Sequence, residues 1–173
     1  GKVASDLKSE GAAEPAIVAG DITTAAGCKS VADEALAAAG GRIDILVNNA
    51  GGSRPLGKNE ETEAFWEEAH ALNFASARRI TKPLIGPMKA AGFGRIVNIT
   101  GAIFGKAING AGPSKAALLA WSRALSFELA PSGITVNCVA PGRINSVQIL
   151  ERLHPTEASR QAFIKDNIPA GRF

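Results

Sequence analysis

Four short apolar runs of this sequence are each followed by polar or glycine residues that could hold a ligand. The runs end at Asp21, at residues 48–51, at residues 100–101 and at residues 141–142. Amide, hydroxyl and carboxylate groups form hydrogen bonds, and glycine lets a ligand approach the backbone closely. A binding site for a polar small molecule combines these two features. We therefore expect a ligand to bind where these four segments meet.

The four segments meet only if the runs before them form neighbouring strands of one sheet. The candidate strands cover residues 16–20, 43–48, 94–100 and 134–139, and the candidate helices cover residues 24–39, 61–90 and 113–130. Because strands alternate with helices, the pattern predicts a parallel sheet covered on both faces. Right-handed crossovers then give a doubly wound α/β fold. Ligands of such folds bind beyond the carboxyl ends of the strands, where the four segments lie.

Capping residues and prolines predict where the helices begin and bend. Thr23 or Thr24 can cap the first helix, and Pro113 suits the first turn of the third. Pro83 and Pro87 lack a backbone N–H, so we expect them to kink or break the second helix. The third helix carries an apolar stripe that we expect in the core, namely Ala117, Leu118, Trp121, Leu125 and Leu129.

Composition limits the function classes. The length of 173 residues suits a single domain over residues 1–173, and 46% hydrophobic with 20% charged residues is typical of a globular protein. A net charge of +3 without a Lys/Arg cluster argues against nucleic acid as a partner. No apolar stretch is long enough for a signal peptide or a membrane span, so we expect a cytoplasmic protein without a membrane partner. Two cysteines indicate neither a disulfide framework nor a metal site.

Several motifs, in order, resemble those of a known family. Asp21 and Ile22 are similar to the residues that contact adenine, and Asn49, Ala50 and Gly51 to a strand-end motif. Asn73 matches a catalytic asparagine, and Lys115 matches a catalytic lysine. The segment after the fourth strand is similar to one that holds the nicotinamide carboxamide, and its residues are Pro141, Gly142, Ile144 and Ser146. These motifs resemble the short-chain dehydrogenases/reductases, and the 3-oxoacyl-carrier-protein reductase type most of all.

The resemblance implies a Rossmann-type fold, NAD or NADP as cofactor, and hydride transfer to or from a small-molecule carbonyl or secondary alcohol. Of the residues named above, Asn73 would be catalytic, Lys115 would be both catalytic and cofactor-binding, and all the others would bind the cofactor. The family forms homodimers or homotetramers through its two long helices, here about residues 72–90 and 113–130. Residues 143–167, polar and irregular apart from a candidate helix near 156–166, resemble its substrate loop.

The chain departs from the family pattern at its reactive positions. Ala111 stands where the family has its tyrosine, and the chain contains no tyrosine at all. Gly101, with Thr100 beside it, stands where the family has its serine. The Gly-rich phosphate turn and the last strand of the family are also absent, although residues 1–4 could belong to an early strand. We therefore expect the sheet to be incomplete at both ends and the full protein to contain further residues.

These departures leave two functions open. The reduction of a ketone needs a proton, which alanine cannot supply. Losing general acid–base catalysis lowers the reaction rate by roughly 10²–10⁴-fold. The chain is then either an impaired oxidoreductase or a catalytically silent member that binds nucleotide or serves as an assembly subunit.

Each candidate site residue also has an interpretation without any function in binding or catalysis. Lys115 and Asn73 could lie on a helix surface, Asp21 could cap a helix, and Ser146 could sit in a turn. Thr100 could substitute for the missing hydroxyl, whereas His154 on a polar loop is expected to be solvated.

Overall fold

A computed structural model describes residues 2–52, 56, 61–101, 103 and 108–173. The chain divides into two compact units, one ending at Val139 and the other spanning Ala140–Phe173. Among the described residues, no helix has the length and apolar character that crossing a bilayer requires. The same residues hold no cluster of three His, Cys, Asp or Glu side chains that could bind a metal ion.

The first unit is built on a parallel sheet of three strands. Its order is β1 (Ile45–Asn48), β2 (Gly94–Ile99) and β3 (Ile134–Val139). The register pairs Asn48 with Asn98 and Ile99 with Val139, so the strands end close together. Three of the four predicted strands are therefore confirmed, as is the parallel α/β fold class. The carboxyl ends of these strands form one edge, as the sequence predicted.

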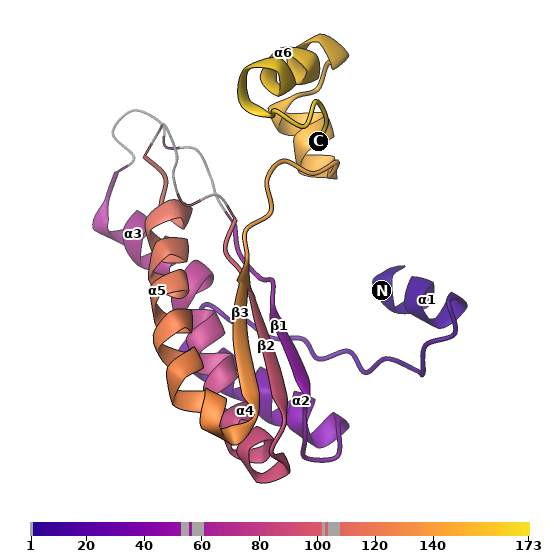
Figure 1. Cartoon of the computed structure of the whole chain (residues 1–173), viewed down its shortest axis with the longest axis vertical. Helices are drawn as coiled ribbons and strands as arrows, with labels where there is room; N and C mark the ends of the chain where they lie inside the picture. The colour runs from indigo at the N-terminus through magenta and orange to yellow at the C-terminus, as the bar shows by residue number, and fades with distance from the viewer. Residues whose placement is uncertain (1, 53–55, 57–60, 102, 104–107) are drawn as a thin grey trace. The chain divides into compact units, whose positions relative to one another are not determined.

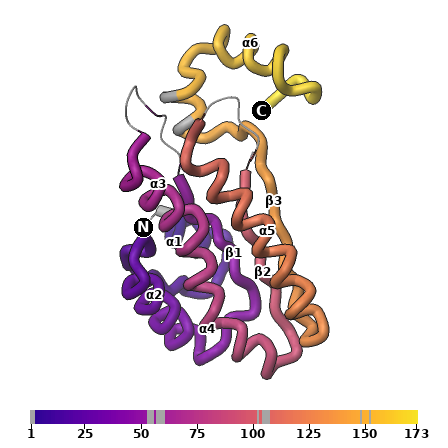
Figure 2. The backbone as a smooth tube through the Cα atoms, turned by 90° about the vertical axis from the view of Figure 1, so that its left-hand side faces the viewer, coloured from indigo at the N-terminus to yellow at the C-terminus, as the bar shows by residue number. Residues whose placement is uncertain are grey.

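Helices cover one face of this sheet (Figures 1 and 2). The connection from β1 to β2 contains α3 (Glu63–His70), the π-helix η1 (Ala71–Ala75) and α4 (Ser76–Ala91). The connection from β2 to β3 contains α5 (Ala111–Leu129) and the short η2 (Ala130–Ser132). The core lies between α4, α5 and the sheet and contains Leu84, Met88, Ile96, Leu125, Leu129, Ile134 and Val136. The predicted stripe of the third helix is thus largely in the core.

The opposite face of the sheet carries exposed apolar side chains. Ile45, Val47 and Val139 are 61%, 53% and 48% exposed. Burial alternates along β2 and most of β3, as expected of strands packed on one side only. The second layer of helices that covers a doubly wound sheet is not among the described residues.

Helix α2 (Ala25–Ala38) begins at a compact turn and packs against α4. The Thr24 hydroxyl oxygen accepts a hydrogen bond from the Gly27 amide at 3.0 Å, as expected of an N-cap. A Cβ at residue 27 would lie 1.9 Å from the carbonyl oxygen of Asp21, so the turn requires glycine there. The predicted cap and helix are confirmed.

Three local expectations were wrong. Residues 16–20 form no strand, and Ile17 is 69% exposed, because a strand needs a neighbour to satisfy its backbone and β1 pairs only with β2. The N-terminal residues form α1 (Lys2–Ser9) rather than part of a strand. The expected break of the second helix is absent, since α4 contains both Pro83 and Pro87, whereas a kink at these residues stays a prediction; the hydrogen-bond pattern changes earlier, in η1.

The second unit contains the π-helix η3 (Gln148–Leu153) and α6 (Glu157–Asn167), of which α6 was expected. Thr156 caps α6 by accepting a hydrogen bond from the Ser159 amide at 3.2 Å. His154 packs its ring against Phe163 and Phe173, with ring centroids 4.6 and 5.8 Å away. Its Nε2 atom is buried, which contradicts the expectation of a solvated histidine. Aromatic contacts rather than water surround this ring.

A chain of buried polar side chains crosses the covered face of the sheet. Asn48 donates through Nδ2 to Asn98 Oδ1 at 2.8 Å and to Thr81 Oγ1 at 3.0 Å. Asn98 donates in turn to Ser122 Oγ at 2.7 Å, and Ser122 donates to the Leu118 carbonyl at 2.6 Å. This network joins α4, β1, β2 and α5 just below the carboxyl ends of the strands. Because its members are buried, each bond matters more than a surface bond would.

We expect Asn98→Ala to lower the free energy of unfolding by roughly 1–3 kcal/mol, because it removes the partner of two buried groups, Asn48 and Ser122. Urea denaturation followed by circular dichroism measures the change. Asn137→Ala is the matched control, since Asn137 lies on the neighbouring strand with an exposed side chain and should change stability by less than about 0.5 kcal/mol. Equal losses in the two variants would contradict the role of the network.

Candidate functional site

Three elements meet at Gly51, in the loop after β1. A Cβ at residue 51 would lie 2.9 Å from Asn73 Oδ1, 2.9 Å from Lys115 Nζ and 3.1 Å from Lys115 Cε. The loop therefore passes so close to η1 and α5 that a side chain at residue 51 would force Asn73 or Lys115 to shift. The sequence singled out these three residues separately, and the structure brings them together. Asn49 and Ala50, just before Gly51, are exposed at the same edge.

Lys115 is buried in the first turns of α5, with 8% of its surface exposed. Its ammonium group donates to the Ile99 carbonyl at the end of β2 at 2.8 Å and to the Ala50 carbonyl after β1 at 3.4 Å. Burial lowers the pKa of Lys115 below the ordinary value for lysine. An ammonium has three N–H donors, and the described residues supply only these two acceptors, so one donor remains for a bound group. The reading of Lys115 as a solvated surface lysine is wrong.

Asn73 holds the loop after β1 from the π-helix η1. Its Nδ2 atom donates to the carbonyls of Gly52 and Ala69, both at 2.9 Å, and its Oδ1 atom accepts from the Gly52 amide at 3.0 Å. The side chain is 2% exposed, so it is not a surface amide. Single π-turns inside helices are frequent at functional sites. Asn73 therefore fixes the position of residues 50–52 relative to α5.

The start of α5 lies against α3 and leaves a small hollow. A Cβ on Gly110 would lie 2.3 Å from the Ala69 Cβ and 3.2 Å from two ring atoms of Phe65, so the backbone is as close as glycine allows. Ala111, the next residue, borders a hollow of about 150 Å³ whose other described lining residues are Gly52, Phe65, Glu68, Ala69, Leu72, Asn73 and Gly110. The helix starts two residues earlier than predicted, since Asn109 accepts a hydrogen bond from the Gly112 amide at 2.9 Å.

Thr100 and Gly101 close the site at the end of β2. The Thr100 amide and hydroxyl both donate to the Val139 carbonyl, at 2.9 and 3.3 Å, and the side chain is 5% exposed. The Thr100 hydroxyl is thus used to join β2 to β3. Gly101 has φ = +72°, in the left-handed region. A side chain at residue 101 would therefore be strained.

Asp21 and Ile22 serve the turn before α2. One carboxylate oxygen of Asp21 accepts from the Thr23 hydroxyl at 2.6 Å and from the Thr23 amide at 3.0 Å, and these bonds lower the pKa of Asp21. The Ile22 carbonyl accepts from the buried Cys28 thiol at 3.0 Å. The ordinary reading of Asp21 as a residue of the helix start therefore agrees with its contacts. A role for both residues in binding adenine stays a prediction.

Pro141, Gly142, Ile144 and Ser146 belong to the second unit, which starts directly after β3. Ser146 Oγ accepts from the Ile149 amide at 3.4 Å, as a residue at the start of η3 does. Ile144 is 58% exposed. This hydrogen bond lies within the second unit, and the expected role of all four residues toward a cofactor stays a prediction.

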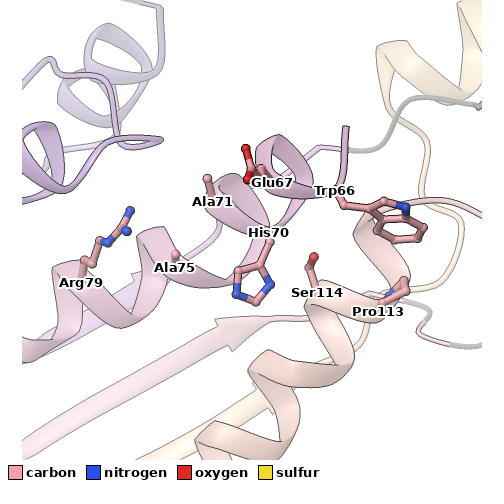
Figure 3. A pocket seen from close by; sticks show the side chains of 8 residues that line it. All are labelled: Trp66, Glu67, His70, Ala71, Ala75, Arg79, Pro113 and Ser114. Carbon is pink, nitrogen blue, oxygen red and sulfur yellow. The ribbon is translucent and has the colours of Figure 1, made fainter. Parts of the chain in front are cut away.

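A larger hollow of about 490 Å³ lies between the α3–η1–α4 segment and the start of α5 (Figure 3). It is lined by Trp66, Glu67, His70, Ala71, Ala75, Arg79, Pro113 and Ser114. None of the residues predicted for the site borders it. Sequence reasoning missed this surface, although Trp66 and His70 stand four residues apart, on one face of a helix. His70 is exposed.

Comparisons with known proteins agree with this geometry. The family model for short chain dehydrogenases matches residues 1–158. Nodulation protein G of Azospirillum brasilense is 33% identical over 159 residues, which cover 90% of this chain and 63% of that protein. 3-Oxoacyl-[acyl-carrier-protein] reductase FabG of Escherichia coli (strain K12) is 34% identical over 156 residues, 88% of this chain and 62% of that protein.

Among solved structures, L-sorbose reductase from Gluconobacter frateurii, complexed with NADPH and L-sorbose, superposes with a TM-score of 0.87. Its sequence identity is 26%, over 99% of this chain and 69% of that one. The chain spans less than two thirds of the length of each of the two curated relatives, nodulation protein G and FabG. The predicted family resemblance is confirmed by these matches.

We expect Gly51→Ala to lower the free energy of unfolding by about 1–3 kcal/mol, because the new methyl group displaces Asn73 or Lys115 from its buried hydrogen bonds. Thermal and urea denaturation measure the change. Gly52→Ala is the adjacent control, since its Cβ would make an ordinary contact of 3.4 Å with Leu72 Cδ2. If both variants are equally stable, the close approach at residue 51 does not constrain the site.

Proposed function

The chain belongs to the short-chain dehydrogenase family, and from this premise we propose that it is an NAD(P)-dependent oxidoreductase. It would transfer a hydride between a nicotinamide cofactor and a carbonyl or secondary alcohol. The observation that carries the proposal is the meeting of Lys115, Asn73 and Gly51 at the carboxyl ends of β1 and β2. This is the edge where open α/β sheets bind their ligands.

The residues present fit one end of such a cofactor. Lys115 keeps an N–H donor that a ribose hydroxyl oxygen could accept, and Gly51 leaves the backbone accessible beside it. Asn49 and Ala50 would line the same contact, with Asp21 and Ile22 toward the adenine and Pro141 and Gly142 toward the carboxamide. When bound, the cofactor supplies or accepts the hydride. L-sorbose reductase, which is similar in structure, binds NADPH.

The proton that completes the reaction has no obvious source at this site. A ketone that gains a hydride becomes an alkoxide, and the methyl group of Ala111 cannot protonate it. The Thr100 hydroxyl is already bound to the Val139 carbonyl. The buried Lys115 ammonium can stabilise the alkoxide electrostatically, as a positive charge in a site of low dielectric. We therefore propose slow turnover, below that of an enzyme with a general acid by roughly 10²–10⁴-fold.

A catalytically silent protein is the second candidate. The small hollow at Ala111 and the left-handed Gly101 favour it, because both positions lack a side chain that could act on a substrate. Such a protein would bind the nucleotide or join an assembly without turnover. Lys115 and Asn73 would still be needed, since both hold the backbone of the loop after β1.

The two candidates separate when a proton donor is restored. Ala111→Tyr places a phenol group on the same face of α5 as Lys115, because the two residues are four positions apart. Ala111→Phe is the control, since it has the same ring without the hydroxyl group. We expect reduced nicotinamide cofactor to bind all three proteins saturably, and ketone-dependent oxidation to rise by roughly 10²–10⁴-fold in Ala111→Tyr alone. Gly101→Ser can be added afterwards, at a strain cost of about 1–3 kcal/mol.

Fluorescence titration with NADH and NADPH and the absorbance of the reduced cofactor are the two measurements. Activity found only in Ala111→Tyr, with none in the parent chain, supports the silent candidate. Activity in the parent that Ala111→Tyr raises supports the slow enzyme, and equal activity in all three proteins would reveal a different proton donor. Absence of saturable cofactor binding in all three would refute the oxidoreductase proposal itself.

The outer surface of α5 is proposed to contact a second copy of the chain, as a homodimer or homotetramer. Phe127 is 73% exposed and Leu119 is 39% exposed, eight residues apart on the face of α5 turned away from the sheet. Large exposed apolar side chains on one face are a feature of protein contacts.

A cytoplasmic location is proposed as well, since both cysteines, Cys28 and Cys138, are free thiols.

We expect Phe127→Glu to shift the protein toward monomer, because the contact would bury a charge. Light scattering after size-exclusion chromatography gives the molar mass. Val139→Glu is the control, since Val139 is also exposed but lies on the sheet. A molar mass that is the same for the parent and both variants would place the contact elsewhere or exclude it.

A further inference from the structure

The hollow beside Ala111 is a space that the proposed chemistry leaves unfilled. It has a volume of about 150 Å³ and is bordered by α3, η1, the loop after β1 and the start of α5. Ala111 presents only a methyl group to it. Apolar cavities on the order of 150 Å³ in protein interiors take up benzene-sized molecules.

The walls of the hollow cannot close by a simple shift of α5. Gly110 already touches α3, because a Cβ there would lie 2.3 Å from the Ala69 Cβ. On the other side, Asn73 is fixed by three hydrogen bonds to Gly52 and Ala69. The space at Ala111 is therefore held open by contacts on both sides of it.

The lining is apolar apart from a few groups. Phe65, which is 3% exposed, joins Ala69, Leu72 and Ala111 as the apolar wall. Both N–H groups of the Asn73 amide are already used, by Gly52 and Ala69, so this side chain has no donor left for water or a ligand. Among the described lining residues, Glu68 is the charged one, and its side chain is exposed. A carboxylate accepts several hydrogen bonds at once, so a ligand can share it with other partners.

We propose that this hollow is a binding site for a compact six-membered ring that carries one hydroxyl group, such as phenol or cyclohexanol. The ring fills the apolar space between Phe65, Leu72 and Ala111, and the hydroxyl donates to the Glu68 carboxylate at the solvent side. Binding requires no cofactor, so the inference goes beyond the oxidoreductase proposal and is tested independently of it. For a ligand of this size, a Kd on the order of 1 mM is expected.

The test measures binding of benzene, phenol, cyclohexanol and 2-naphthol to the full chain by ligand-observed NMR and calorimetry, without nucleotide. Phenol is expected to bind about three- to tenfold tighter than benzene, because it adds one hydrogen bond to a charged acceptor at a solvated position. The preference should disappear in Glu68→Leu. The two-ring 2-naphthol exceeds the space and should bind at least tenfold more weakly than phenol.

A matched pair of variants locates the ligand. Ala111→Leu fills the hollow and should weaken phenol binding at least tenfold, whereas Ala120→Leu makes the same change at an exposed position of the same helix and should leave binding unchanged. Equal phenol affinity in the two variants would overturn the proposal. If Ala111→Leu does not fold, the size series on the parent chain decides, and 2-naphthol binding as tightly as phenol would overturn it.

Discussion

A buried ammonium group holds the carboxyl edge of this sheet together. Lys115 contacts the carbonyl at the end of β2 and the carbonyl that follows β1, so one positive charge joins two strands to α5. Removing an ammonium from water costs several kcal/mol unless polar groups replace the water. Its position near the start of a helix adds to this cost, because the helix macrodipole is positive there. The two carbonyl partners offset both effects, and they fix where the loop after β1 must lie.

The geometry at residue 51 follows from that constraint. The loop that contacts Lys115 also meets Asn73, and a side chain at residue 51 would have to displace one of them. Asn73 then satisfies the Gly52 amide and carbonyl, which the loop has turned away from the sheet. The polar network from Thr81 to Ser122 lies just below and sets the distance between α4 and α5. The site is thus an outcome of satisfying buried polar groups, and its rigidity comes from the fold.

Much of this arrangement could be predicted from the sequence because it depends on local patterns. The β-branched runs of β1, β2 and β3 identify the strands, and parallel pairing places their ends together. What failed depends on partners distant in sequence. Residues 16–20 have a strand-like composition but no neighbouring strand with which to pair. Helix α4 continues through Pro83 and Pro87. Its packing against the sheet and α2 offsets the backbone hydrogen bonds that the two prolines cannot donate. The hollow at Ala111 depends on how closely α5 approaches α3, which no local pattern reveals.

The same contacts give Lys115 and Asn73 a role in the fold that does not depend on any reaction. Lys115 and Asn73 each have a structural task, because Lys115 donates to the carbonyls of Ala50 and Ile99 and Asn73 bonds the amide and carbonyl of Gly52. Their presence is therefore weak evidence for turnover. A side chain at residue 111 has no such task, since Ala111 borders a hollow and the helix begins correctly without it. A change at residue 111 therefore removes none of the hydrogen bonds that hold the loop after β1. Any account of this chain as an enzyme must therefore rest on what happens at that position.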